Sequence, residues 1–250
     1  MSNAKWIKEI RSLSSKRNRE EAGLFVAEGP KVVADLIAAG WASSALYASQ
    51  DGCERLPEKL KAVATLIPED VLERISFLQH PQGVVGLFHL RKHREAPLPS
   101  SDELYLALDG VQDPGNVGTI IRIADWFGIN RIYCSPDTAD AYAPKVVQAS
   151  MGSIARVEMV YTDLPALIGS LPAEIPVYGT LLDGEDMYGK ALTPHGIIVM
   201  GNEGNGISET LRGMIGNRLL IPNFRPAGQG AESLNVAVAT AIVCSEFRRK

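Results

Sequence analysis

The chain has 250 residues, of which 46% are hydrophobic and 22% charged, a balance typical of globular proteins. No apolar run approaches the roughly 18 residues that a membrane-spanning helix needs, and the polar N-terminus lacks the apolar segment of a secretory signal. The three cysteines and four histidines show neither a disulfide framework nor metal-ligand spacing, so we expect a cytoplasmic protein without a metal site or a membrane partner.

The N-terminal part predicts a small α/β domain over residues 1–95. Helices are expected at 6–13 and 30–39, and short strands at 24–27, 45–48, 64–67 and 84–90. Charged residues, prolines and serines gather at 91–103 with little to bury, which indicates a domain boundary. We therefore place a linker at 96–103 and a second domain at 104–250.

The second domain alternates short apolar strands with helices. Strands are expected at 104–108, 131–134, 156–160, 177–181, 197–200 and 219–221, and helices at 117–127, 144–150, 164–171, 208–215 and 233–249. This pattern is typical of a mostly parallel sheet with helices on both faces. Ligands of such sheets bind beyond the carboxyl ends of the strands, so the loops there are the candidate site.

The first of three informative loops follows the strand at 104–108. Residues 113–116 favour a turn into a helix, and Asn116 is a candidate N-cap. Arg122 stands in an apolar stretch of that helix, where an arginine is costly to bury without an anion. Two interpretations are open: a structural ion pair with Asp125, or contact with a phosphate or a reacting ribose.

The second loop, residues 201–208, holds three glycines between a buried strand and a helix that Ser208 can cap. Its spacing is G-x-x-G-x-G, which differs from the dinucleotide fingerprint, and no Lys-Ser/Thr pair of a Walker motif follows. NAD and nucleotide triphosphates are thus not indicated. Glu203 within this loop has two interpretations, a functional carboxylate or a cap of a neighbouring helix.

The third loop precedes the last helix. Residues 226–230 form a glycine-rich turn, and Ser233 is a good candidate for the N-cap of the helix at 233–249. At the other end of the chain, Lys16, Arg17 and Arg19 belong to a basic arm. That arm is either an RNA-binding element or a solvated helix face, and the overall charge of −4 does not favour the former.

Together these loops resemble the SpoU (TrmH) family of RNA ribose 2′-O-methyltransferases, part of the knotted SPOUT superfamily. Three motifs carry the resemblance: Asn116-x-Gly118-x-x-x-Arg122-x-Ala124, Gly201-Asn202-Glu203-Gly204-x-Gly206, and Ile221-Pro222 followed by Glu232-Ser233-Leu234-Asn235. The segments Phe25–Lys31 and His80–Val84 are similar to the substrate-binding domain, related to ribosomal protein L30e, that precedes many members' catalytic domains.

The resemblance implies a fold, a cofactor and site residues. The fold would be a C-terminal domain with a deep trefoil knot, usually dimerised through that domain, after a small L30e-like α/β domain. The cofactor would be S-adenosyl-L-methionine, held by Thr180, Leu181, Met200, Gly201, Asn202, Gly206, Ile221 and Leu234. The catalytic set would be Arg122, Asn116, Glu203, Ser233 and Asn235, with RNA contacts from Lys16, Arg17, Arg19, Arg122 and Arg225.

The implied reaction methylates a ribose 2′-hydroxyl, which makes RNA rather than DNA the substrate. Arg122 would organise the target phosphate and hydroxyl, because a free guanidinium holds its proton too firmly to act as a base. Ribosomal RNA is favoured over tRNA on the strength of the appended N-terminal domain. The alternatives are a tRNA 2′-O-methyltransferase, methylation of a base nitrogen, and a catalytically silent RNA-binding or assembly protein.

One departure from the family pattern lies between Ile221-Pro222 and Glu232. Residues 223–231 make this loop longer than is usual in the family, and they include Phe224 and Arg225. The loop would contact RNA by stacking and charge, or it would close over the cofactor.

Overall fold

The computed structural model describes residues 3–91, 96–225, 229 and 231–249. The chain divides into two compact units, one formed by Met1–Lys92 with Asp140–Arg156 and the other by His93–Ala139 with Val157–Lys250. The sequence-based boundaries thus differ from the structure at 140–156, a segment assigned by sequence to the C-terminal domain but packed with the N-terminal residues.

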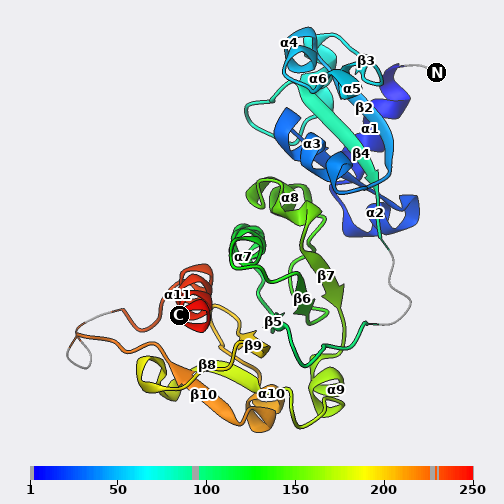
Figure 1. Cartoon of the computed structure of the whole chain (residues 1–250). Helices are drawn as coiled ribbons and strands as arrows, with labels where there is room; N and C mark the ends of the chain where they lie inside the picture. Colours follow the sequence, from blue (N-terminus) through cyan, green and yellow to red (C-terminus); the bar gives the residue numbers. More distant parts are fainter. Residues whose placement is uncertain (1–2, 92–95, 226–228, 230, 250) are drawn as a thin grey trace. The chain divides into compact units, whose positions relative to one another are not determined.

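The first unit is built on a four-stranded sheet in the order β1-β4-β2-β3, coloured blue to cyan in Figure 1. Its strands are β1 (Leu24–Glu28), β2 (Ser43–Ala48), β3 (Thr65–Leu66) and β4 (Val84–His89), with β4 antiparallel to β1 and β2. Its helices are α1 (Asn3–Ser12), α2 (Lys16–Ala22), α3 (Pro30–Ala38), α4 (Gln50–Glu54), α5 (Glu58–Lys61), α6 (Glu69–Ile75), α8 (Pro144–Ala149) and the 3₁₀ turn η1 (Ser153–Ala155).

The segment Asp140–Arg156 is held in this unit by buried side chains. The indole Nε1 of Trp41 donates to the carbonyl of Ala155 at 3.1 Å, and the rings of Phe25 and Tyr142 lie 4.9 Å apart. Aromatic pairs at this separation add to the gain from burial alone. Residues 140–156 therefore complete the core of the N-terminal unit.

Arg19 contributes to the same packing. It is 2% exposed, its Nη1 donates to the carbonyls of Leu13 and Ser14, and its other nitrogens donate to the carboxylate of Asp140. A buried guanidinium with these partners has no surface left for a phosphate. The prediction that Arg19 contacts RNA is contradicted by the structure.

The second unit contains a six-stranded sheet in the order β10-β8-β9-β5-β6-β7, in which every neighbouring pair is parallel. Its strands are β5 (Leu104–Leu108), β6 (Arg131–Cys134), β7 (Glu158–Tyr161), β8 (Val177–Asp186), β9 (Gly196–Met200) and β10 (Asn217–Leu220). Its helices are α7 (Pro114–Trp126), α9 (Leu164–Gly169), α10 (Glu209–Met214), α11 (Val236–Arg248) and the 3₁₀ turn η2 (Met187–Gly189). The predicted α/β class and parallel sheet are confirmed.

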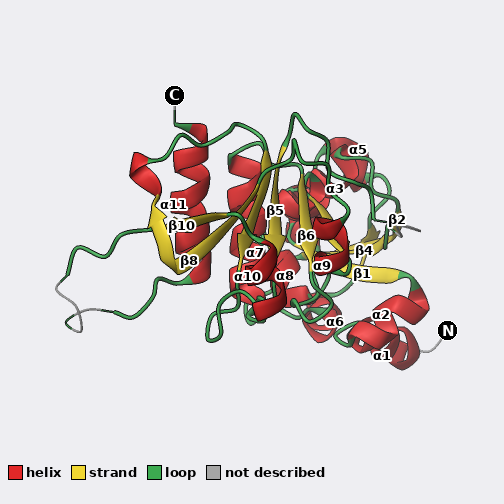
Figure 2. Ribbon diagram, turned by 90° about the horizontal axis from the view of Figure 1, so that it is seen from below, coloured by secondary structure: helices red, strands yellow, loops and turns green. Residues whose placement is uncertain are grey.

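Both faces of this sheet are buried. Alternate residues such as Tyr105, Ile197 and Val199 share a core with the apolar side chains of α9 and α10, including Leu167 and Leu211. Figure 1 shows α7 and α11 on the opposite face, and Figure 2 shows the strands twisting from β10 and β8 across to β6. Burial on both faces explains why these strands are nearly continuous apolar runs.

The register aligns the carboxyl ends of β5, β6 and β9 with the last position at which β8 pairs with β9. Leu108 of β5 pairs with both Met200 of β9 and Cys134 of β6, and Gly179 of β8 pairs with Val199. The loops that follow these positions consequently leave the sheet at one edge. That edge is where a ligand of a parallel sheet is expected.

Candidate active site at the carboxyl edge of the sheet

Three polar side chains, from the first turn of α7, the glycine-rich loop and the N-cap of α11, form a continuous line of hydrogen bonds at this edge, which we call the bonded line. Asn116 donates from Nδ2 to Oε1 of Glu203 at 2.9 Å, and Asn235 donates from Nδ2 to Oδ1 of Asn116 at 3.0 Å. Asn116 thus uses both ends of its amide, which fixes the amide's orientation. The three motifs singled out in the sequence meet at this line.

The line begins at the N-terminus of α7. Asp113, and not Asn116, is the N-cap of this helix, because its Oδ1 accepts from the backbone N–H of Asn116 at 2.9 Å. Glu203 also accepts from the N–H groups of Gln112 and Asp113, each at 3.4 Å. The carboxylate therefore lies at the positive end of the helix dipole, and the two interpretations of Glu203 are compatible.

The line ends at the N-terminus of α11. Asn235 is the N-cap there, since its Oδ1 accepts from the N–H groups of Ala237 at 3.0 Å and Val238 at 3.2 Å. The predicted cap, Ser233, is exposed in the preceding loop and bonds to no other described residue. The prediction is wrong because Asn235 serves both the helix and Asn116, which the shorter Ser233 side chain two residues earlier cannot do.

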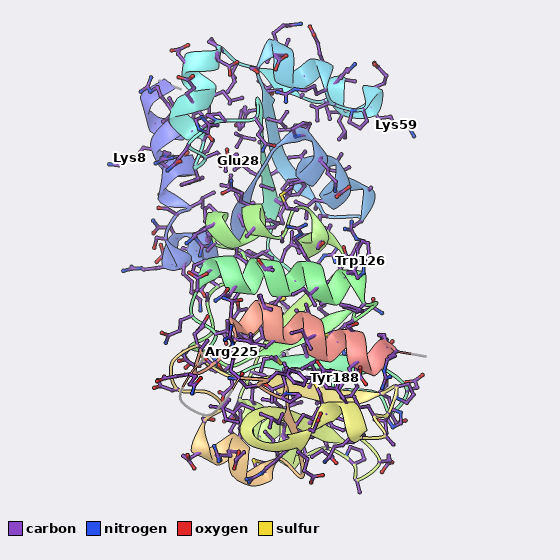
Figure 3. The ribbon with its side chains drawn as sticks, turned by 90° about the vertical axis from the view of Figure 1, so that its left-hand side faces the viewer. Lys8, Glu28, Lys59, Trp126, Tyr188 and Arg225 are labelled. Atoms are coloured by element: carbon purple, nitrogen blue, oxygen red, sulfur yellow. The ribbon has the colours of Figure 1, made fainter. Side chains whose placement is uncertain are left out.

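Helices α7 and α11 run side by side in the same direction, as Figure 3 shows. Their first turns are joined through Asn116 and Asn235, and near their far ends Arg248 donates from Nε to the carbonyl of Phe127 at 3.0 Å. Two positive helix ends therefore converge on the bonded line.

Arg122 is exposed on α7, in contrast to the buried position expected from its apolar neighbours. It makes no hydrogen bond or ion pair with another described residue, so the predicted alternative of an ion pair with Asp125 is not found. Trp126, four residues later, is 85% exposed and lies on the same helix face. The guanidinium is available to a ligand from solution.

The glycine-rich loop after β9 is a closed turn. The backbones of Asn202 and Gly206 exchange two hydrogen bonds of 2.9 Å, and a Cβ at Gly201 would lie 2.3 Å from the carbonyl carbon of Gly206. The side chain of Asn202 accepts from the N–H groups of Gly204 and Asn205 and donates to the carbonyl of Gly110 at 2.7 Å. Glycine is required at position 201, and Asn202 holds the loop in shape.

The remaining predicted cofactor residues lie in β8 beyond Gly179, at the ends of β9 and β10, and shortly before α11. Leu181 and Met200 have buried side chains, and Thr180 donates from Oγ1 to the carbonyl of Val199 at 3.3 Å. Ile221 is half-buried, and Leu234 is 50% exposed. The edge thus offers backbone polar groups beside exposed apolar side chains.

Sequence reasoning missed Asp109, directly after β5. Its Oδ2 accepts from the N–H of Ser208 at 2.7 Å, and Ser208 itself forms no side-chain cap. The start of α10 is therefore fixed by a carboxylate from another loop. The sequence could have indicated Asp109, because it is an acidic residue at the carboxyl end of a predicted parallel strand, where the ligand-binding loops of such sheets begin.

The described part of the chain contains no cluster of three metal-binding side chains, and none of its helices has the length and apolarity of a membrane span. Burial raises the pKa of the Cys134 thiol and raises that of Cys244 to about 12. Neither thiol is a nucleophile at neutral pH.

The basic residues proposed for RNA lie at exposed positions, apart from Arg19. Lys16 and Arg17 are exposed on α2, where Arg17 pairs with Glu21 at 2.7 Å. Arg225, labelled in Figure 3, is exposed after β10. Residues 226–228 and 230 of the long loop lie outside the described residues.

Comparison with family models gives two matches. Residues 103–245 match the SpoU rRNA Methylase family, and residues 4–86 match the MRM3-like substrate binding domain.

Individual proteins are similar over nearly the whole chain. The 23S rRNA (guanosine(2553)-2′-O)-methyltransferase RlmP of Bacillus subtilis is 30% identical, covering 97% of this chain and 95% of the relative. The structure described as a TrmH-family RNA methyltransferase from Porphyromonas gingivalis is 40% identical, with a TM-score of 0.86 over 99% of this chain and 98% of that one. An AdoMet-bound rRNA methyltransferase from Sinorhizobium meliloti is 34% identical, with a TM-score of 0.84 over 97% and 93%.

Proposed function

The chain belongs to the SpoU rRNA methylase family, and we propose that it methylates a ribose 2′-hydroxyl of ribosomal RNA using S-adenosylmethionine. The observation that carries the proposal is the bonded line Glu203–Asn116–Asn235 with an exposed, unpaired Arg122 on the same helix as Asn116. The line joins the three motifs into one rigid unit, and the arginine supplies a cation for an RNA phosphate.

The residues present fit the cofactor. Leu182 and Leu234 are 75% and 50% exposed, which provides apolar surface for an adenine ring, and the closed glycine loop presents backbone amides and carbonyls. The residues that would hold the cofactor are Thr180, Leu181, Met200, Gly201, Asn202, Gly206, Ile221 and Leu234. When bound, S-adenosylmethionine supplies an activated methyl on a sulfonium, so the chain needs no nucleophile of its own.

The chain's own side chains would orient and polarise the hydroxyl. Arg122 keeps its proton at neutral pH, so it binds the target phosphate and stabilises developing negative charge on the 2′-oxygen. The 2′-hydroxyl proton passes to the substrate phosphate that Arg122 holds. The bonded line keeps α7 in position, and Ser233, exposed beside Asn235, is available to contact the ribose.

Ribosomal RNA is the proposed substrate for two reasons. The Bacillus subtilis and Sinorhizobium meliloti relatives are rRNA methyltransferases, and residues 4–86 match a substrate-binding domain. We assign RNA contacts to Lys16 and Arg17 in that domain and to Arg225 in the long loop. RNA affinity should then fall steeply as the salt concentration rises. The double variant Lys16→Gln with Arg17→Gln should reduce the slope of affinity against salt concentration. An unchanged slope would show that this helix face is only solvated.

We also propose a homodimer through the C-terminal unit, a trefoil knot within it, and a cytoplasmic location. Trp126, at the end of α7, and Val238, in the first turn of α11, are 85% and 50% exposed, and a second copy packed along both helices would cover them. Sedimentation of the wild-type protein and of Trp126→Glu tests the dimer. A monomeric wild type would refute it.

The function is tested by incubating the protein with tritiated S-adenosylmethionine and purified rRNA or tRNA. Label in rRNA supports the proposal, and label in tRNA alone would redirect it to a tRNA 2′-O-methyltransferase. Normal cofactor binding with no label in either RNA would favour a catalytically silent RNA-binding or assembly protein.

A further inference from the structure

The pairing of β8 with its neighbour β10 is interrupted by a register shift. Arg218 of β10 pairs with Gly179, but the next residue, Leu219, pairs with Glu185. Residues 180–184 therefore bulge out of the ladder at the carboxyl edge of the sheet. The bulge returns through Gly184, where a Cβ would lie 2.6 Å from the backbone of Leu219.

A single carboxylate at this bulge binds two arginines. Oδ2 of Asp183 accepts from Nη2 of Arg212 at 2.6 Å and lies 3.3 Å from Nη1 of Arg218. Arg218 also donates from Nη2 to the carbonyl of Arg212 at 3.3 Å. We call Asp183, Arg212 and Arg218 the Asp183 cluster.

The Asp183 cluster joins three segments of the proposed cofactor site. Asp183 lies in the bulge that contains Thr180 and Leu181, Arg212 lies on α10 directly after the glycine loop, and Arg218 lies on β10 before Ile221. No other described carboxylate forms ion pairs with both α10 and β10.

The burial of the Asp183 cluster argues against a role in overall stability. The side chains of Asp183, Arg212 and Arg218 are 46%, 35% and 40% exposed. Exposed ion pairs contribute little to the free energy of unfolding. Their effect is instead local, because residues 180–184 have no ladder partner on β9 or β10.

We propose that Asp183 is a positioning residue for the cofactor, which rests on the proposed function. Asp183 holds residues 180–184 in the conformation that binds S-adenosylmethionine. Without its carboxylate, part of the binding free energy is spent on ordering these residues. The groups assigned to the methyl transfer, Arg122 and the bonded line, have no hydrogen bond or ion pair with the cluster. Affinity should therefore fall while the rate of the bound complex is kept.

The test compares Asp183→Asn with the wild type by calorimetric titration of S-adenosylmethionine. We expect Kd to rise about three- to tenfold, because ordering the loop costs at least as much free energy as immobilising one side chain. The value of kcat should stay within about twofold of the wild type. Without cofactor, hydrogen exchange at residues 180–184 should accelerate in the variant. Glu185→Gln is the matched control, because the Glu185 carboxylate forms an ion pair only with Lys190, at 3.1 Å, among the described residues. The Kd of this variant should match that of the wild type.

Unchanged affinity and exchange in Asp183→Asn would overturn this role while leaving the proposed function intact. A loss of kcat equal to the loss of affinity would also overturn it. If the wild-type protein itself fails to bind S-adenosylmethionine, the proposed function fails, and this role of Asp183 fails with it.

Discussion

Asn235 performs two tasks that substitution can separate. Its Oδ1 caps α11 by accepting from two backbone N–H groups, and its Nδ2 donates to Asn116. Asn235→Ala removes both. We expect it to lower the free energy of unfolding by about 1 kcal/mol, the typical cost of a lost N-cap. For a chain of this size that corresponds to a transition about 2–4 °C lower in calorimetry.

Asn235→Asp keeps the cap, because aspartate is as good an N-cap as asparagine, but it replaces the donor with a carboxylate. Asn116 cannot compensate by turning its amide, since its Nδ2 already donates to Glu203. Losing a hydrogen bond in a charged network costs about 1.5–3 kcal/mol, which corresponds to methyl transfer about 10- to 100-fold slower. The assay is transfer of tritium from labelled cofactor to rRNA, alongside calorimetry.

Asp163→Ala is the matched control, because Asp163 caps α9 by accepting from the N–H of Ala166 at 2.9 Å, away from the bonded line. It should lose stability like Asn235→Ala but transfer methyl within about twofold of the wild type. Wild-type transfer by Asn235→Asp would refute the role of the bonded line. Equal slowing by Asp163→Ala would attribute the effect to stability alone.

Three further predictions concern other sites. Arg122→Ala should slow methyl transfer about 10²–10³-fold while cofactor affinity stays within about twofold, because the side chain has no described partner to lose. Transfer assays and cofactor titrations check this. An equal loss of transfer rate and cofactor affinity would show that Arg122 has a structural role. Burial raises the pKa of Glu28 in the folded protein, so the native state disfavours the charged carboxylate. Wild-type stability should therefore fall relative to Glu28→Gln as pH rises above about 4.5, and denaturant titrations showing a pH-independent difference would contradict this. Native protein should react with a thiol reagent at Cys53, with buried Cys134 and Cys244 reacting only after denaturation; three fast thiols would refute the buried core.

Most strands were predictable because they are short apolar runs bounded by polar residues, as in β5 and β9. Strand β10 is half polar, and it begins at Asn217, two residues before its predicted position. Four short helices of the first unit were not predicted: α2 and α4–α6 have four to seven residues. Helices α2, α4 and α5 lack a periodic apolar face, and the apolar face of α6, formed by Val71, Leu72 and Ile75, extends over only two turns. Tertiary packing holds them in place. The register shift between β8 and β10 at 180–184 was equally invisible, because it depends on how β10 meets Gly184.

The motifs of the site were recognisable in the sequence, but the partners of their residues were not. Asn235 bonds to Asn116 across 119 positions, and Arg19 binds Asp140 across 121. The local sequence favours Ser233 and Asn235 equally as N-caps, and it predicts that Arg19 is a solvent-exposed charge. Only the folded chain decides between these, since the deciding contact is distant in sequence.

The central claim, methyl transfer to a ribose 2′-hydroxyl, is tested most directly by alkaline hydrolysis of rRNA labelled with tritiated cofactor. Alkali cleaves RNA through attack of the 2′-hydroxyl on the adjacent phosphate, which a 2′-O-methyl group blocks. We predict that the label is recovered in alkali-resistant dinucleotides and that Arg122→Ala gives almost none. Label recovered in mononucleotides would place the methyl on a base and contradict the account.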